Sequence, residues 1–210
     1  EQVGAVLSDL RSRPPNLAHV SAPFGFTYED AVEVRRHGEP PAFEFEPRDH
    51  VALGEALGVL DVERGVRTSG SRFVYLLGDI VQVQFALVRH ALDILTVRGF
   101  VPVIPPVLVR EEAMFGSGFL PTDEVNIYVT SPDELYLVGT SEVSLAAFHA
   151  GEILDEADLP IRYAGYSTCF RREAGTYGKD MGGMFRVHQF DKVEMFTFTT
   201  PDRSVEEHEF

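Results

Sequence analysis

Cysteine, lysine and tryptophan are scarce in this 210-residue chain, which has one cysteine, two lysines and no tryptophan. The lone thiol, Cys169, excludes an internal disulfide framework and a zinc site built from several cysteines. It also favours a reducing, cytoplasmic location. The sequence shows no signal-peptide pattern and no apolar run near the roughly 20 residues that a membrane span requires. We therefore expect no membrane association.

Positive charge is also scarce, because Lys and Arg number 18 against 33 Asp and Glu, giving a net charge of −15. This balance argues against a general nucleic-acid coat protein. The exception is residues 162–192, which carry six basic side chains, including both lysines, against three acidic ones. A basic island in an acidic chain fits a locally bound anionic ligand. From charge alone, a chance cluster on a solvated hairpin fits equally well.

The composition changes near Asp49. Residues 1–45 start with a helical pattern that Pro14-Pro15 stops, and a proline-rich, extended connection follows. Residues 46–210 hold the remaining patterned segments, and 44% apolar residues overall are enough to fill a core. We expect one large domain preceded by the end of a helix and a linker.

The patterned segments alternate short strands with helices, and Gly99 is placed to end the longest helix. Antiparallel hairpins with helices laid against them predict an α+β fold. Thr200-Pro201-Asp202 reads as a helix start close to the end of the sequence, so we expect a piece of a longer protein. Helices are predicted over residues 50–60, 79–98, 111–115 and 143–154, and strands over 72–77, 100–104, 126–130, 134–138, 161–171 and 184–199.

The strongest local pattern lies in residues 169–196, where two strands flank a glycine-rich loop. Side chains alternate between the two faces of a strand, so Arg171 and Glu173 share a face. On the second strand one face is polar and the other apolar, if no bulge intervenes. The mostly polar set is Arg186, His188, Lys192 and Glu194 together with Phe190, and the apolar set, predicted to be core, is Phe185, Val187, Val193 and Met195.

The polar face carries the residue types that a nucleotide site needs. Arginine binds phosphate with a forked geometry, phenylalanine offers a flat apolar face, and glutamate accepts hydrogen bonds from an amino group. A half-exposed hairpin with a solvated charged face explains the same pattern. Two further residues fit structural roles: Cys169 as a small core side chain and His188 as a structural histidine. The seven histidines are scattered, and no metal site is predicted.

Residues 169–196 resemble motif 2 of the class II aminoacyl-tRNA synthetases, and specifically the version found in bacterial-type seryl-tRNA synthetases. The shared pattern is FR-x-E, then AG, a glycine-rich loop with a basic residue and Asp, and R-x-HQF-x-KVE. The resemblance covers residues 40–210 in order and includes FEPRDHVALGEALGVLD at 45–61, SGSRFVYL at 69–76, GFVPVIPPVLV at 99–109, GSGFLP at 116–121 and LYLVGTSEVSL at 135–145.

The resemblance implies an antiparallel class II sheet flanked by helices, acting as a homodimer and incomplete at its C-terminal end. Residues 46–210 would form the catalytic core with motifs 1 and 2, and motif 3 is absent. Residues 1–45 would be the end of an N-terminal helical arm and its linker. Motif 1 would lie at 99–108, with Pro106 at the dimer interface. The implied function is a serine–tRNA ligase that activates L-serine with ATP and transfers it to tRNA(Ser), with Mg²⁺ expected.

The resemblance also assigns site residues. Arg171 would hold the ATP α-phosphate and stabilise charge in adenylate formation, which makes it the catalytic residue. Glu173 would read the adenine amino group, Phe190 would stack on the base, and Val187 would offer backbone contacts. The ATP-binding set is Arg171, Arg172, Glu173, Arg186, Val187 and Phe190.

Serine and tRNA have their own implied residues. Thr140-Ser141-Glu142 matches the loop that grips the serine ammonium, although Thr140 and Glu142 also suit a helix start. Glu194 would bind serine at its hydroxyl. Lys179 and Asp180 lie in the loop expected to meet the tRNA acceptor end.

Some departures from the family pattern leave alternatives open. Besides the missing motif 3, the loop reads Lys179-Asp180-Met181, and Gln82, Gln84 and Ser141 are milder differences. One alternative is a synthetase-like paralogue that adenylates serine or a related amino acid for an acceptor other than tRNA. A second is a non-catalytic binding module.

Overall fold

The computed structural model describes residues 2–14, 17–174 and 183–210, and the chain divides into two compact units, Glu1–Arg48 and Asp49–Phe210. The first unit contains helix α1 (Gln2–Ser12), which confirms the helix predicted there, and a 3₁₀ turn, η1 (Tyr28–Asp30). Its described residues from 17 to 48 are exposed and form no strand. That these residues form an extended linker stays a prediction.

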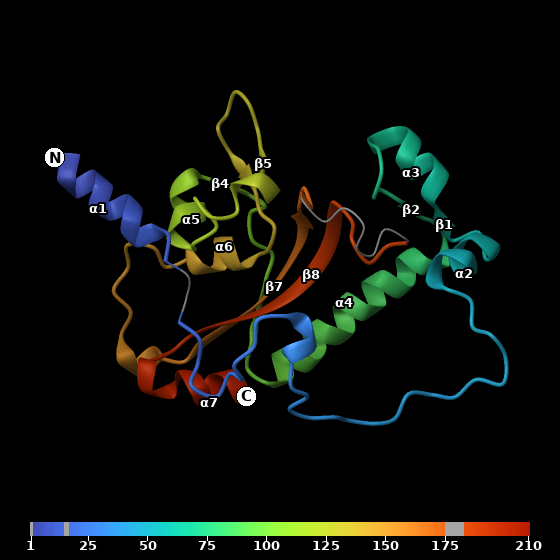
Figure 1. Cartoon of the computed structure of the whole chain (residues 1–210), viewed down its shortest axis with the longest axis horizontal. Helices are drawn as coiled ribbons and strands as arrows, with labels where there is room; N and C mark the ends of the chain where they lie inside the picture. The colour runs from blue at the N-terminus through green and yellow to red at the C-terminus, as the bar shows by residue number, and fades with distance from the viewer. Residues whose placement is uncertain (1, 15–16, 175–182) are drawn as a thin grey trace. The chain divides into compact units, whose positions relative to one another are not determined.

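The second unit builds its α+β fold from six helices and eight strands, together with short 3₁₀ turns, among its described residues (Figure 1). The helices are α2 (His50–Ala56), α3 (Val62–Ser69), α4 (Asp79–Val97), α5 (Glu111–Gly116), α6 (Glu142–Ala146) and α7 (Ser204–Glu209). The strands are β1 (Leu60–Asp61), β2 (Tyr75–Leu76), β3 (Val101–Val103), β4 (Leu108–Val109), β5 (Tyr128–Val129), β6 (Tyr136–Leu137), β7 (Ile161–Phe170) and β8 (Gln189–Phe198).

A long, twisted hairpin of β7 and β8 forms the main sheet (Figure 1). The two strands pair antiparallel from Ile161↔Phe198 to Phe170↔Gln189. Strand β3 adds to the other edge of β7 in parallel, giving the order β3-β7-β8. A second, antiparallel sheet has the order β4-β6-β5. The α+β prediction is confirmed, with one parallel pair that the antiparallel expectation did not include.

Helix α4 lies along this sheet. Its Leu95 forms one core with Phe100 and with Ala164 of β7, and Val193 of β8 packs against this core. Gly99 ends the helix at φ +85°, as predicted. A polar cluster reinforces the contact, because Asp191 accepts hydrogen bonds from Gln84 of α4 at 2.6 Å and from Thr168 of β7 at 2.7 Å. These contacts tie α4 to the back of the strand that carries Phe190 and Glu194.

One prediction about α4 needs correction. With 19 residues, α4 is long and apolar enough to span a membrane by length and composition alone, whereas we expected no such run. This is weak evidence, because the core helix of a soluble protein can pass the same test. The composition arises because α4 has apolar side chains both toward the sheet and on an exposed stripe of Val83, Leu87, Ile94 and Val97.

A second core supports the turn that precedes α6. Its fully buried members are Met114 of α5, Val138 and Val143, and its other buried members are Val109, Leu120 and Ile127. These side chains come from α5, α6 and the strands around them. By packing together, they hold the turn at residues 139–141 in place. Thr140 and Ser141 are themselves buried, with 2% and 0% of their surface exposed.

Several predicted boundaries were wrong. The strand predicted at 184–199 begins only at Gln189, the helix at 143–154 ends at Ala146, and the strand at 72–77 shrinks to Tyr75–Leu76. Phe185 and Met195, predicted to be core, are 79% and 56% exposed. Helix α3 was not predicted, because its few apolar residues and Gly65 hid the helical period.

Candidate active site

The site forms where β7 ends and β8 begins. Arg171 follows β7 directly, and its backbone N–H donates to His188 O at 3.0 Å. His188 Nδ1 donates in turn to Arg171 O at 2.9 Å, and its ring lies 5.2 Å from the Phe73 ring. His188 therefore links the two chain segments just beyond the paired ends of β7 and β8, which confirms its structural role.

Four of the predicted ATP-binding side chains converge here. Arg171, Glu173, Arg186 and Phe190 line a common cavity of about 460 Å³, together with Val187. The Arg171 guanidinium carbon lies 5.4 Å from the centre of the Phe190 ring, and Arg186 Nη1 donates to Glu173 Oε2 at 3.2 Å. A flat apolar ring, two guanidinium groups and a carboxylate thus face one space, which suits a planar base carrying phosphates.

Arg171 also reaches the buried turn. Its Nε donates to Gly139 O at 3.1 Å, directly beside Thr140. The same guanidinium group therefore borders both the cavity over Phe190 and the turn at residues 139–141. A group held between two subsites can stabilise charge that passes from one to the other.

The turn at residues 139–141 meets the polar face of β8. Glu194 Oε2 accepts hydrogen bonds from Thr140 Oγ1, from Ser141 Oγ at 3.1 Å and from Glu142 N at 3.2 Å. Lys192 Nζ lies 2.8 Å from the same oxygen and 2.5 Å from Thr140 Oγ1. Residues more than 50 positions apart in sequence thus form one polar cluster.

The electrostatics of Glu194 follow from these contacts. Burial raises the pKa of this carboxyl, but the hydrogen bonds from Lys192, Thr140 and Ser141 outweigh it and hold the pKa below its ordinary value. Glu194 therefore remains an anion at neutral pH. A partly buried carboxylate in a polar cluster is suited to bind a small ligand that carries an ammonium or hydroxyl group.

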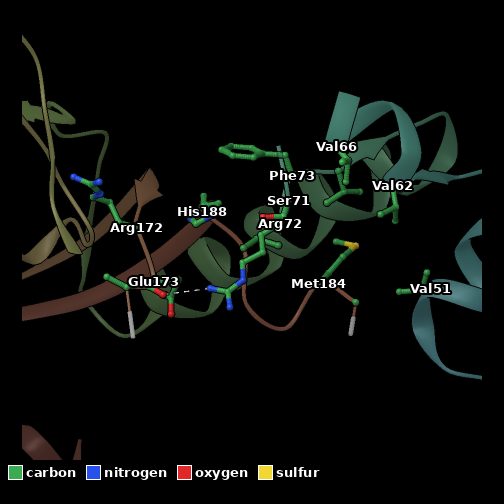
Figure 2. A pocket seen from close by; sticks show the side chains of 14 residues that line it. Val51, Val62, Val66, Ser71, Arg72, Phe73, Arg172, Glu173, Met184 and His188 are labelled. Atoms are coloured by element: carbon green, nitrogen blue, oxygen red, sulfur yellow. Dashed lines mark hydrogen bonds between the residues drawn. The ribbon is translucent and has the colours of Figure 1, made fainter. Parts of the chain in front are cut away.

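Not every predicted residue joins the site. Arg172 is exposed, and its guanidinium carbon lies 5.9 Å from the Tyr128 ring rather than beside Arg171. With Arg72, Glu173 and Val187, it lines a neighbouring pocket of about 460 Å³ under α3 (Figure 2). Pro106 is exposed and accepts a hydrogen bond from Ser144 Oγ at 2.6 Å. Lys179 and Asp180 lie outside the described residues.

Two residues were missed. Lys192 shares the face of Phe190 and Glu194 but received no role, although its period-two spacing could have shown it. Asn126 carries no sequence signal, because its partners, Arg172 and Ala174, lie more than 40 residues away.

Cys169 is fully buried, and burial raises the pKa of its thiol, which confirms it as a core side chain. Among residues 2–14, 17–174 and 183–210, no three His, Cys, Asp or Glu side chains lie close enough together to hold a metal ion.

Comparison with known proteins gives one consistent family. The class II tRNA synthetase core domain (G, H, P, S and T) matches residues 128–209. The curated serine–tRNA ligase of Acidothermus cellulolyticus is 58% identical over 92% of this chain, which covers 46% of that protein. The chain therefore spans about half the length of the curated relatives it matches.

Solved structures agree with the sequence match. The chain is similar to the seryl-tRNA synthetase of Pyrococcus horikoshii complexed with ATP, with a TM-score of 0.94 and 43% identity, over 99% of this chain and 51% of that one. It is also similar to the cytoplasmic serine–tRNA ligase of Naegleria fowleri in complex with AMP, with a TM-score of 0.91 and 34% identity, over 99% of this chain and 50% of that one. By sequence and by fold, the chain is similar to seryl-tRNA synthetases over about half of their length, and residues 128–209 match the class II tRNA synthetase core domain.

Proposed function

We propose that this chain contributes the serine- and ATP-binding halves of a serine–tRNA ligase active site. The observation that carries the proposal is the position of Arg171 between the cavity over Phe190 and the buried turn that meets Glu194. ATP bound over Phe190 and serine bound at Glu194 would meet at this guanidinium group. The complexes of the related proteins with ATP and AMP support the nucleotide assignment.

The reaction needs little proton transfer from the protein. A carboxylate oxygen of serine attacks the α-phosphorus of ATP in line, the bond to the leaving oxygen breaks, and pyrophosphate departs. Arg171 would bind the α-phosphate and stabilise the charge that builds there. In the second step a ribose hydroxyl of tRNA(Ser) attacks the seryl carbonyl carbon, and AMP leaves.

The individual roles are those that the family resemblance implies, and the contacts around the site support them. Phe190 offers its ring to adenine, Glu173 accepts from the adenine amino group, and Arg186 adds a second cation, with Val187 at the edge and Arg172 as an outer contact. Glu194 binds the serine hydroxyl, while Thr140, Ser141 and Glu142 hold the ammonium end. A site that must hydrogen-bond a hydroxyl penalises alanine and glycine strongly.

The remaining assignments belong to the same proposal. Residues 46–210 form the catalytic core and residues 1–45 a helical arm and linker, in a cytoplasmic protein without membrane attachment that acts as a homodimer with Pro106 at its interface. Lys179 and Asp180 would meet the tRNA acceptor end. Mg²⁺ is expected to accompany ATP, but the described residues supply no cluster of ligands for it, and no step is assigned to it.

The test is amino-acid-dependent ATP–pyrophosphate exchange with serine, threonine, alanine and glycine. It uses this chain and a form extended to the full length of its relatives, with Arg171→Ala as the inactive control. We expect exchange with serine alone in the extended form and charging of tRNA(Ser) on adding tRNA. Exchange without charging would favour another acceptor, and no exchange in a folded extended form would leave a binding module.

A further inference from the structure

Glu173 has an unusual backbone conformation. Its φ is +49°, in the left-handed region that side chains other than glycine rarely adopt. Its side chain is 13% exposed, and its carboxylate meets Arg186 Nη1 at 3.2 Å. The direction of this carboxylate depends on a backbone conformation that the surrounding structure must hold in place.

Asn126 provides that support from a distant part of the sequence. Arg172 N donates to Asn126 O at 2.9 Å, and Ala174 N donates to Asn126 Oδ1, also at 2.9 Å. One residue therefore accepts from the backbone on both sides of Glu173. Rotation of the Glu173 backbone toward an ordinary conformation would break at least one of these bonds.

Asn126 is itself oriented by its neighbours. It ends the 3₁₀ turn η2 (Glu124–Asn126), and its Nδ2 donates to Asp123 Oδ1 at 2.7 Å. A carboxylate can only accept, so this contact assigns the amide nitrogen to Asp123 and leaves the amide oxygen for Ala174. Asn126 also lines a cavity of about 350 Å³ with Arg171, Glu173 and Arg186.

We propose that Asn126 is a positioning residue that holds Glu173 for reading the exocyclic amino group of the nucleotide base. The proposal rests on the proposed function, in which Glu173 faces adenine. A carboxylate selects an amino group only when its oxygen lies within hydrogen-bond reach of it. Without the bond from Ala174 N to the Asn126 side chain, Glu173 samples other conformations, so the base loses its partner while the phosphates keep theirs.

The test measures base selectivity in serine-dependent pyrophosphate exchange. The ratio of kcat/KM for ATP to that for purine riboside triphosphate, which lacks the 6-amino group, is compared between the unchanged protein and Asn126→Ala. We expect the ratio to fall about tenfold, mainly through a higher KM for ATP, with little change for the analogue. Because both substrates are measured on the same preparation, the ratio does not depend on the fraction of protein that is folded.

A swapped pair serves as the matched control. Combining Asp123→Asn with Asn126→Asp keeps a hydrogen bond between the two side chains and keeps an acceptor oxygen for Ala174 N. We expect this double variant to restore the ratio. An unchanged ratio in Asn126→Ala, or a swapped pair as unselective as the alanine variant, overturns the proposal. Absence of exchange in the unchanged, extended protein would instead contradict the proposed function.

Discussion

At the scale of single residues, the hydrogen bonds that Glu194 accepts from described residues all go to one oxygen, Oε2. The donors are Thr140, Ser141, the backbone N–H of Glu142 and Lys192. Lys192 is the only cation among them, and it also donates to Thr140 Oγ1 at 2.5 Å. Lys192 therefore orders both Thr140 and Glu194 in the pocket that we propose for serine.

Replacing Lys192 with methionine should weaken serine binding and make it dependent on pH. Without the ammonium group, burial raises the pKa of Glu194, so serine binding strengthens as pH rises through that higher pKa. In the unchanged protein the pKa is held below its ordinary value, so Glu194 stays ionised above about pH 5. We expect a KM for serine about 10- to 100-fold higher at neutral pH, measured from about pH 5 to about pH 8.

Lys192→Arg is the control for this change, because it keeps the positive charge. It should retain a flat pH profile even if the longer side chain raises the KM for serine. A flat profile in Lys192→Met as well would show that Lys192 does not govern the ionisation of Glu194.

The residues of the site were predictable to different degrees for a physical reason. Alternation along β8 places Phe190, Lys192 and Glu194 on one face, and this local rule needs only the sequence. The contact between Glu194 and Thr140 joins residues 54 positions apart, and only the resemblance to a known family indicated it. Asn126 belongs to no motif, so its contact with Ala174 could not be predicted at all.

At the scale of elements, helix α3 shows how a close approach overrides a weak local pattern. Gly65 is buried in α3, and a Cβ built on it would lie 2.2 Å from Phe73 O and 2.7 Å from Val74 Cα. These are backbone atoms, so the segment before β2 cannot move aside cheaply. The absence of a side chain at residue 65 lets α3 lie directly on this segment.

Gly65→Ala should therefore destabilise the fold, although alanine is the better helix former. We expect a loss of about 1–3 kcal/mol from the steric overlap, against an intrinsic helix gain of about 1 kcal/mol. Gly116→Ala is the matched control, because Gly116 also lies in a helix and a Cβ there would meet nothing within 4 Å. Urea unfolding of the two variants compares them, and equal stabilities would contradict the close packing.

The misplaced boundaries have related causes. Residues 184–188 continue the alternating pattern of β8, but they lie beyond the last β7 partner, because Phe170 pairs with Gln189. Helix α6 ends at Ala146 even though apolar residues continue, and Gly151 at φ +79° follows in the turn. Periodicity predicts that an element exists, whereas tertiary pairing determines where it stops.

At the scale of the whole molecule, one ion pair fastens the last helix to the central sheet. Arg162 of β7 donates through Nε and Nη2 to the two carboxylate oxygens of Glu207 in α7, both at 2.8 Å. The Arg162 guanidinium carbon also lies 4.1 Å from the centre of the Phe210 ring. The Glu207 side chain is only 5% exposed. The pair thus joins two segments 45 residues apart.

Glu207→Gln should lower the melting temperature by a few degrees at neutral pH. The Arg162 hydrogen bonds lower the pKa of Glu207, so its stabilising contribution is full above the ordinary value of 4.5 and is lost as pH falls through the lowered pKa. The difference between the two proteins should therefore shrink in acid. Glu209→Gln, on the same helix, is the control, and a difference that persists unchanged in acid would refute the assignment.

Helix α4 exposes a stripe of apolar side chains that a binding partner could cover. Val83, Leu87, Ile94 and Val97 recur at helical spacing and are 49%, 64%, 45% and 89% exposed, while Leu95 on the other side is buried against the sheet. Contiguous exposed apolar side chains on a charged protein suit an interaction surface. The same apolar content gives α4 the composition of a membrane span. Either a partner chain or a lipid surface could therefore cover the stripe.

Leu87→Asp should separate the two explanations, because a charge in the middle of the stripe opposes burial in either setting. If a second copy covers α4, light scattering after gel filtration gives a dimer for the unchanged chain and a monomer for the variant. Arg89→Ala, on the side of α4 where Arg89 pairs with Asp93 at 2.7 Å, should leave the dimer intact. A monomeric unchanged chain that floats with lipid vesicles would instead assign the stripe to a membrane.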